Sequence, residues 1–314
     1  MLRKIAITIG DPAGIGPEVA LKSIMSNDIA GLCEPVIIGD MAVIEEAVER
    51  FDLPVSPEYI EIVNVGQITD REFIKGRPSA AGGRASVAYI KKAVDLALNN
   101  SVDAIVTAPI SKESLNIAGF KWPGHTEMLA ELTGAKDFAM VFYSEHLRLI
   151  LVTRHTALRN VPSMITKDNV LRTIVLALKA CDIMDIGNPR IAVAGLNPHA
   201  GESGIFGSEE IDAIEPAVKE ARQLGIPVSG PYPPDVLFHK AYNDEFDIIV
   251  CMYHDQGLIP LKMIAFDRGV NITVGLPIIR TSPDHGTAND IAWKGIANPS
   301  SITEAIKLSV KMRK

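Results

Sequence analysis

Three histidines stand directly after three apolar runs of this 314-residue sequence. They are His155 after residues 147–153, His199 after residues 190–196, and His254 after residues 248–252. If the runs are strands of one sheet or of facing sheets, their carboxyl ends bring the three imidazoles together, and three neutral imidazoles with an open position make a catalytic divalent-metal site. A lone histidine is more often a hydrogen-bonded interior or surface residue, which is the interpretation we keep for His146 and His239.

Two acidic residues adjoin these histidines, and either could orient an imidazole ring. Asp255 directly follows His254, and Glu202 lies three positions after His199. A carboxylate that accepts a hydrogen bond from one ring nitrogen fixes the tautomer, so the other nitrogen faces the metal. We therefore expect Asp255 to support catalysis.

A second group of residues favours an anionic substrate. It consists of His125, Thr126, Lys262, Asn271 and Arg280, with Lys112 as a further donor. Arginine offers a planar fork and lysine a point charge, the usual pair for carboxylate and phosphate. The alternative for each of these residues is a cap or a turn.

The two groups together indicate a redox reaction on a hydroxy acid. A metal beside an anion clamp can polarise a hydroxyl and its neighbouring carboxylate, which favours loss of a hydride and then of CO2. Lys262 is a candidate for the base that takes the hydroxyl proton. It is equally a candidate for a pure phosphate or carboxylate ligand.

The elements that position these residues alternate between strand and helix, which predicts an α/β fold. A strand over residues 4–9 leads into a glycine-rich loop, residues 10–16, and a helix, which suits close approach of backbone to a ligand. The glycine spacing is not that of a dinucleotide fingerprint. Residues 138–143 and 147–153 form a predicted hairpin in a mixed sheet, and helices are expected over 284–292 and 301–312.

Composition excludes several classes of protein. Hydrophobic residues make up 47% of the chain and the net charge is −7, which argues against a nucleic-acid binder or a basic membrane-surface protein. The three cysteines are odd in number and lack metal-ligand spacing, so buried free thiols in a reducing compartment are expected. The first apolar run is too short to span a membrane and has no cleavage site, and we expect a cytoplasmic protein with no membrane partner.

Several long motifs resemble those of one enzyme family. Gly10-Asp11 with Gly14-Ile15-Gly16-Pro17-Glu18, and His285-Gly286-Thr287-Ala288 with Asp290-Ile291-Ala292, resemble the signatures of the β-decarboxylating isocitrate and isopropylmalate dehydrogenases. More closely, the chain resembles the 4-hydroxythreonine-4-phosphate dehydrogenase family. The motifs that carry this resemblance are Gly124-His125-Thr126-Glu127, Asn197-Pro198-His199-Ala200-Gly201-Glu202, Tyr253-His254-Asp255-Gln256-Gly257 and Gly269-Val270-Asn271-Ile272-Thr273.

The resemblance implies a fold and a site. It implies two α/β/α domains with a cleft between them: residues 1–124 plus 271–314 on the NAD side, and residues 125–270 with the metal ligands and dimer contacts. It implies a homodimer with a shared active site. The implied metal ligands are His155, His199 and His254; the implied substrate ligands are His125, Thr126, Lys262, Asn271 and Arg280; and the implied NAD segment contains His285, Gly286, Thr287, Ala288 and Asp290.

The resemblance leaves the substrate open. One branch oxidises and decarboxylates D-threonate or D-erythronate 4-phosphate to dihydroxyacetone phosphate and CO2, and Trp122-Pro123 and Trp293 favour that branch. The alternative is 4-hydroxy-L-threonine 4-phosphate in pyridoxal phosphate biosynthesis. Distant alternatives are a zinc hydrolase and an inactive binding protein. The native metal (Zn, Co, Ni, Mn or Mg) and the choice of NAD or NADP also stay open.

Overall fold

The computed structural model describes residues 2–54, 60–68 and 74–313, and these residues divide into two compact units. Unit 1 comprises Met1–Lys136 and Leu276–Met312, and unit 2 comprises Asp137–Gly275. The family resemblance implied that the domains change after residues 124 and 270. Helix α5 (His125–Thr133) lies in unit 1 because it contacts α3 (Ala80–Leu98), and strand β10 (Val270–Val274) lies in unit 2 because it pairs with β5 (Ala139–Tyr143).

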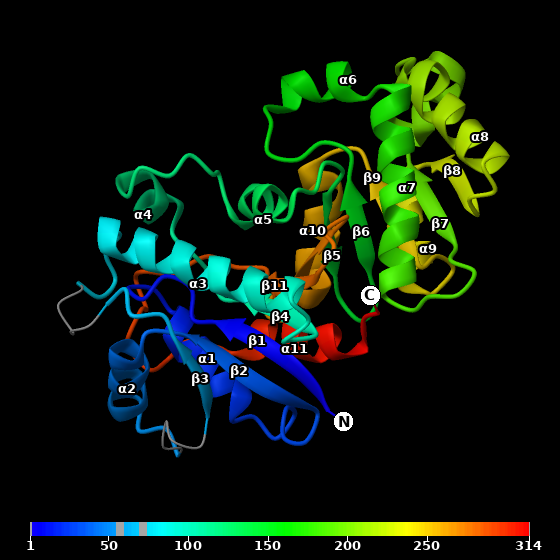
Figure 1. The fold of residues 1–314 in the computed structure, drawn as a ribbon. Coiled ribbons are helices and arrows are strands. Elements are labelled where there is room, and N and C mark those ends of the chain that lie inside the picture. Colours follow the sequence, from blue (N-terminus) through cyan, green and yellow to red (C-terminus); the bar gives the residue numbers. More distant parts are fainter. Residues whose placement is uncertain (1, 55–59, 69–73, 314) are drawn as a thin grey trace. The chain divides into compact units, whose positions relative to one another are not determined.

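Unit 1 is built on a parallel sheet with the strand order β3-β2-β1-β4-β11 (Figure 1). The strands are β1 (Arg3–Thr8), β2 (Cys33–Gly39), β3 (Glu61–Asn64), β4 (Ala104–Thr107) and β11 (Ile279–Pro283). The central strands β1 and β4 are buried on both faces, as expected for a parallel sheet covered by helices.

Helices cover both faces of the unit 1 sheet. The helices α1 (Gly16–Ile24) and α2 (Met41–Arg50) lead the chain outward from β1 to β3, whereas α3 leads it back to β4. Because such crossovers are right-handed, the change of direction puts α3 on the opposite face from α1 and α2. The helix α11 (Ser300–Lys311) contacts α1 as well as β4 and β11. Two shorter helices, α4 (Lys112–Ile117) and α5, follow β4.

Unit 2 has a mixed sheet with the order β10-β5-β6-β9-β7-β8. Its remaining strands are β6 (Arg148–Leu151), β7 (Ile191–Ala194), β8 (Val228–Tyr232) and β9 (Ile248–Cys251). The predicted hairpin is confirmed, since β5 and β6 pair antiparallel and the amide of Ser144 donates to the carbonyl of Leu147 at 2.8 Å. From β6 onward the pairing is parallel.

The helices of unit 2 also divide between two faces. The long helix α7 (Lys167–Ile183) contacts α8 (Glu215–Gln223), while α9 (Pro234–Tyr242) and α10 (His254–Ala265) pack on the other side of the strands. Leu237 of α9 and Leu258 and Leu261 of α10 join Leu149 and Ile249 in one buried apolar cluster. Short turns complete the unit: η2 (Leu158–Asn160), α6 (Val161–Met164), η3 (Pro198–Gly204) and η4 (Glu210–Ile214).

Two further expectations can be compared with the fold. The predicted helix over residues 284–292 is wrong: these residues form turns, and Ala288 and Trp293 adopt positive φ angles of 40° and 61°, which no α-helix contains. Cys33, Cys181 and Cys251 are free and buried, as predicted. Among the described residues, no helix has the length and apolar character needed to cross a membrane.

Candidate functional site

In unit 1, Arg280 lies inside the sheet and is joined to the neighbouring strand. Only 3% of Arg280 is exposed, and its Nε and Nη2 donate to the hydroxyl of Thr107 at 3.1 and 2.8 Å. The contact arises because β11 pairs with β4 in parallel with Arg280 beside Ile105, so the long Arg280 side chain reaches Thr107, the last residue of β4. Burial lowers the pKa of the Arg280 guanidinium to about 9. A buried guanidinium at the carboxyl end of a parallel sheet is suited to hold an anion.

His125 begins α5 in the same unit. Burial lowers the pKa of its imidazole well below the ordinary value, and the positive charge of Arg280 lowers this pKa further. The ring is therefore neutral near pH 7, and its Nε2 is buried with no hydrogen-bond partner among the described residues. A buried polar atom without a partner costs free energy unless a ligand satisfies it.

Two further predicted substrate residues adjoin His125. Thr126 is 3% exposed and is the second residue of α5, where it does not cap the helix, because Gly124 holds the cap position. Gly124 also adjoins Lys112, whose Cε would lie 3.9 Å from a Cβ at that glycine. His125, Thr126 and Lys112 thus gather at the start of one helix.

The predicted NAD segment packs on the glycine-rich loop of unit 1. The amide of Ile15 donates to the carbonyl of Thr287 at 3.1 Å, and a Cβ on Gly14 would lie 3.0 Å from the Cβ of Thr287. A Cβ on Gly16 would lie closer still to the carbonyl oxygen of Ile9. Because Gly14 and Gly16 have no side chain, the loop packs closely against other parts of its own chain. The sequence had instead suggested that these glycines let the backbone approach a ligand.

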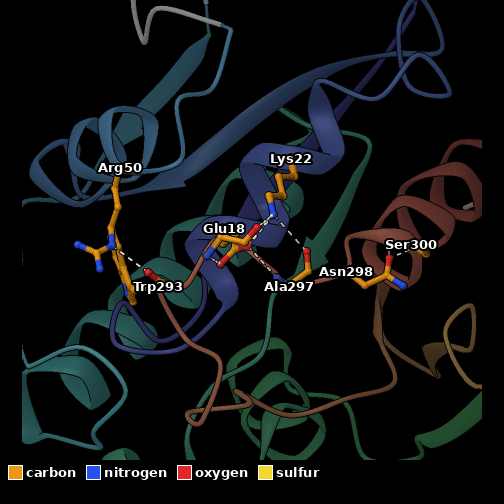
Figure 2. Close-up of polar contacts among 8 residues, drawn as sticks. Glu18, Lys22, Arg50, Trp293, Ala297, Asn298 and Ser300 are labelled. Carbon is orange, nitrogen blue, oxygen red and sulfur yellow. Dashed lines mark hydrogen bonds and ion pairs between the residues drawn. The ribbon is translucent and has the colours of Figure 1, made fainter.

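The residues that follow the NAD segment are fastened to α1 and α2 (Figure 2). The buried carboxylate of Glu18 accepts hydrogen bonds from the amide of Ala297 at 2.8 Å and from Lys22 Nζ at 2.6 Å. Arg50 Nε donates to the carbonyl of Trp293 at 2.8 Å, and the Trp293 indole N–H donates to the carbonyl of Pro12 at 2.8 Å.

These contacts fix the carboxyl-terminal part of the segment from 284 to 297, and they also explain Trp293. Its indole is 2% exposed and connects two parts of unit 1, so its presence needs no substrate. Trp122 stacks on Phe120 at 5.4 Å, and its indole N–H donates to Glu131 at 2.7 Å. Sequence reasoning missed Glu18 as an anchor, although an acidic residue in the first turn of a helix is a usual partner for backbone amides.

In unit 2, the three histidines follow three neighbouring strands. The order β6-β9-β7 is parallel throughout, so His155, His254 and His199 all come after carboxyl ends at one edge of the sheet. The rings of His155 and His254 lie 5.5 Å apart between centroids. Asp255 Oδ1 is 2.7 Å from Nδ1 of His254, which leaves Nε2 of that ring to face a ligand.

His199 is placed differently. Its side chain is 67% exposed, its Nδ1 lies 3.3 Å from Glu202 Oε2, and its ring meets that of Phe206 edge to face at 6.0 Å. Across residues 2–54, 60–68 and 74–313, no three histidine, cysteine, aspartate or glutamate side chains form a group that could hold a metal ion. The structure thus brings His155 and His254 together within one chain and does not add His199 to them.

The last two predicted substrate residues also lie in unit 2. Lys262 is on α10, partly buried, with its Nζ 5.6 Å from the ring centroid of Phe266. Asn271 is on β10 opposite Phe142, and its Oδ1 is shielded from solvent. The outer face of α10 carries Ile259, Met263 and Phe266, which are 58%, 81% and 74% exposed.

Comparisons with known proteins give relatives along the whole chain. A family model described as pyridoxal phosphate biosynthetic protein PdxA matches residues 31–309. A 4-hydroxythreonine-4-phosphate dehydrogenase of Desulforapulum autotrophicum is 46% identical, covering 97% of this chain and 94% of the relative. A D-threonate 4-phosphate dehydrogenase of Pectobacterium atrosepticum is 43% identical, covering 99% and 100%.

Solved structures agree. A 4-hydroxythreonine-4-phosphate dehydrogenase from Klebsiella pneumoniae superposes with a TM-score of 0.92 at 40% identity, covering 100% of this chain and 99% of that one. For the fold alone, a β-decarboxylating dehydrogenase from Thermococcus kodakarensis superposes with a TM-score of 0.50 at 17% identity, covering 96% and 81%. The predicted fold class is confirmed.

Proposed function

Because this chain belongs to the family of the pyridoxal phosphate biosynthetic protein PdxA, whose relatives are dehydrogenases, we propose that it oxidises and decarboxylates a 4-phosphorylated 3-hydroxy acid with NAD. The favoured substrates are D-threonate and D-erythronate 4-phosphate, which would give dihydroxyacetone phosphate and CO2. The alternative substrate is 4-hydroxy-L-threonine 4-phosphate, the kind of compound named in the relative from Desulforapulum autotrophicum.

The observation that carries this proposal is the buried Arg280 together with the half-buried His125, whose Nε2 is shielded from solvent. A guanidinium fixed by the Thr107 hydroxyl and an imidazole kept neutral beside it form a site for one anionic group. The arginine supplies charge and a planar fork, and the neutral imidazole donates or accepts one hydrogen bond without adding charge. Thr126 and Lys112 add donors at the start of the neighbouring helix.

A divalent metal fits the donor set in part. We propose His155, His199 and His254 as its ligands, since neutral imidazoles suit zinc and its neighbours in the first transition row. When bound, the metal would act as a Lewis acid on the hydroxyl and carboxylate of the substrate. His155 and His254 lie side by side with Asp255 orienting one ring, whereas His199 must come from a rearranged loop or from a second copy of the chain.

The remaining residues have roles that follow from their chemistry. Lys262 would take the proton of the C3 hydroxyl or bind an anionic group, and Asn271 would hold a substrate oxygen. NAD would take the C3 hydride and lie against the segment from His285 to Asp290. That segment is held by Thr287 and by the anchors of Trp293 and Ala297, which suits a rigid surface for a cofactor.

A second copy of the chain is the proposed partner. Ile259, Met263 and Phe266 recur along one face of α10 and are all exposed, and a monomer seldom leaves such a row uncovered. Met263→Glu would place a charge in that row and should convert a dimer into a monomer in analytical ultracentrifugation. A matched exposed change, Lys240→Glu on α9, should leave the dimer intact. A dimer that withstands Met263→Glu would show that α10 lies outside the interface.

The test of the function is NADH formation by the metal-loaded protein with the three phosphorylated acids in parallel. Turnover of the two sugar acids with little turnover of the amino acid supports the proposed branch. Preference for 4-hydroxy-L-threonine 4-phosphate would select the alternative. Absence of NADH with all three, in a protein that binds zinc, would favour a hydrolase or a binding protein.

A further inference from the structure

The loop that carries His199 has an unusual backbone. His199, Ala200, Glu202 and Ser203 have φ angles of 54°, 53°, 42° and 57°, and Gly201 between them has 78°. For residues with a Cβ, the left-handed region is unfavourable, and four such residues among five consecutive positions persist only when surrounding contacts determine them. Something other than the intrinsic preference of these residues therefore sets the position of His199.

One buried carboxylate supplies three of the hydrogen bonds that hold the start of the loop. Glu210 is 1% exposed and stands at the start of the π-helical turn η4. Its Oε1 accepts hydrogen bonds from the backbone amides of Leu196 and Asn197, both at 2.7 Å. Its Oε2 accepts a third bond from the side-chain amide of Asn197 at 2.9 Å.

The same carboxylate also meets the loop beyond His199. A Cβ on Gly201 would lie 2.6 Å from Glu210 Oε2, and one on Gly195 would lie 3.1 Å from Oε1. Glu210 thus touches the chain before His199 and after it. The imidazole of His199, 67% exposed, has little packing of its own, so the backbone that Glu210 holds decides where the ring is presented.

We propose that Glu210 is a positioning residue for His199, acting through the backbone of residues 195–201 and not by touching metal or substrate. The inference rests on the proposed role of His199 as a metal ligand. A carboxylate suits this task because it accepts every hydrogen bond offered to it, whereas an amide in its place would turn an N–H group toward other donors.

The test is Glu210→Gln, which keeps the shape of the side chain and removes its ability to accept all three bonds. Glu209→Gln is the matched control, because Glu209 accepts a 2.7 Å bond from the same Asn197 side chain but, within the part of the chain that the structure describes, accepts none from the backbone of residues 195–201. The probe is Co²⁺ added to metal-free protein, followed by calorimetry and by its visible spectrum. A second titration, with NAD, shows whether the NAD site proposed in unit 1 is unchanged.

We expect Glu210→Gln to weaken Co²⁺ binding by roughly 10- to 100-fold, as for other residues that orient metal ligands. NAD affinity should change less than about twofold, and Glu209→Gln should bind Co²⁺ like the unmodified protein. Co²⁺ affinity in Glu210→Gln equal to that in Glu209→Gln would overturn the proposal. A matching loss of NAD affinity would also overturn it, since it would indicate general damage to the fold.

Two more variants keep the test decisive. If Glu210→Gln does not fold, Gly201→Ala presses on the same carboxylate from the far side of the loop and is judged by the same two titrations. His199→Ala separates this inference from the proposed function. Unchanged Co²⁺ affinity in His199→Ala would remove the metal role itself, whereas loss in His199→Ala without loss in Glu210→Gln would remove only the role of Glu210.

Discussion

The two groups of candidate residues differ in how completely one chain assembles them. In unit 1, Arg280 and Thr107 are buried and hydrogen-bonded across neighbouring strands, and the half-buried His125 stands at a helix start. In unit 2, the side chain of His254 is 39% exposed and that of His199 67% exposed, and the rings do not form one group. The proposed anion site is pre-organised within the chain, whereas the proposed metal site needs a further event.

This difference indicates that binding a metal costs more conformational free energy than binding an anion. A pre-organised site loses little conformational freedom when its ligand binds, so its affinity depends on the ligand's own charge and shape. An unassembled site must first bring its ligands together, and its affinity depends on loops and on assembly. Metal binding should therefore respond to protein concentration and to loop changes, and anion binding should not.

The largest effect is expected from removing one of the candidate histidine ligands in unit 2. His254→Ala removes one of the two adjacent rings and should lower metal-dependent turnover by about 1000-fold or more, because a ligand set with one member missing seldom retains a catalytic metal. NADH formation with added Co²⁺ measures this. His239→Gln, at an exposed histidine outside both groups, should keep full activity. Substantial turnover by His254→Ala would exclude His254 as a ligand.

The next effect concerns Arg280, the proposed anion-binding residue of unit 1. Arg280→Lys retains a positive charge but loses the planar fork and the paired bonds to Thr107, and kcat/KM for the phosphorylated acid should fall by about 100-fold. The KM for NAD should change less than about twofold. Steady-state kinetics with each substrate varied in turn separate the two values. An equal rise in both KM values would contradict an anion clamp.

A smaller effect is expected in the pH dependence of stability. Because the pKa of His125 is lowered in the folded protein, the unfolded chain takes up a proton near pH 6.5 that the folded chain does not. The free energy of unfolding should therefore fall as the pH decreases below about 6.5. His125→Asn removes this contribution, so its urea midpoint should depend less on pH. Parallel pH curves for the two proteins would show that His125 is not held neutral.

The smallest effect tests the anchor of the cofactor segment. Trp293→Phe keeps an aromatic ring and loses the hydrogen bond to Pro12, which should lower the free energy of unfolding by roughly 1 kcal/mol. The affinity for NAD should fall a few-fold because the segment is held less firmly. Chemical denaturation and an NAD titration measure the two effects. Trp122→Phe, in the exposed stack on Phe120, should leave NAD affinity unchanged.

The strand ends were predictable from the sequence, because apolar runs of four to seven residues mark buried strands and polar residues mark where they stop. The sequence thus placed His155, His199 and His254 at one edge of a sheet. It did not predict that Arg280 would meet Thr107, since that contact joins residues 173 positions apart through the pairing of β11 with β4. Secondary-structure propensity does not say which strand pairs with which, so it could not predict this contact.

Two local conformations were also beyond sequence reasoning. The left-handed run from His199 to Ser203 has one glycine among five residues, so nothing in the residue types signals it, and it depends on a carboxylate at Glu210. Residues 284–292 were predicted to be helical, yet they form turns, with the carbonyl of Thr287 accepting a hydrogen bond from the amide of Ile15 and its side chain lying against Gly14. In both cases tertiary contacts override the local preference.

The interruption of unit 1 by unit 2 has a consequence for the order in which the protein can be completed during synthesis. Strand β11 and helix α11 lie beyond residue 275, and Ile279 pairs with Ala104, which is made 175 residues earlier. A ribosome that has released residues up to 275 has released the whole of unit 2, while the sheet of unit 1 still lacks an edge strand. Arg280, the proposed anion-binding residue, is synthesised with that strand. The proposed anion site is therefore completed only after unit 2, which carries the three histidines.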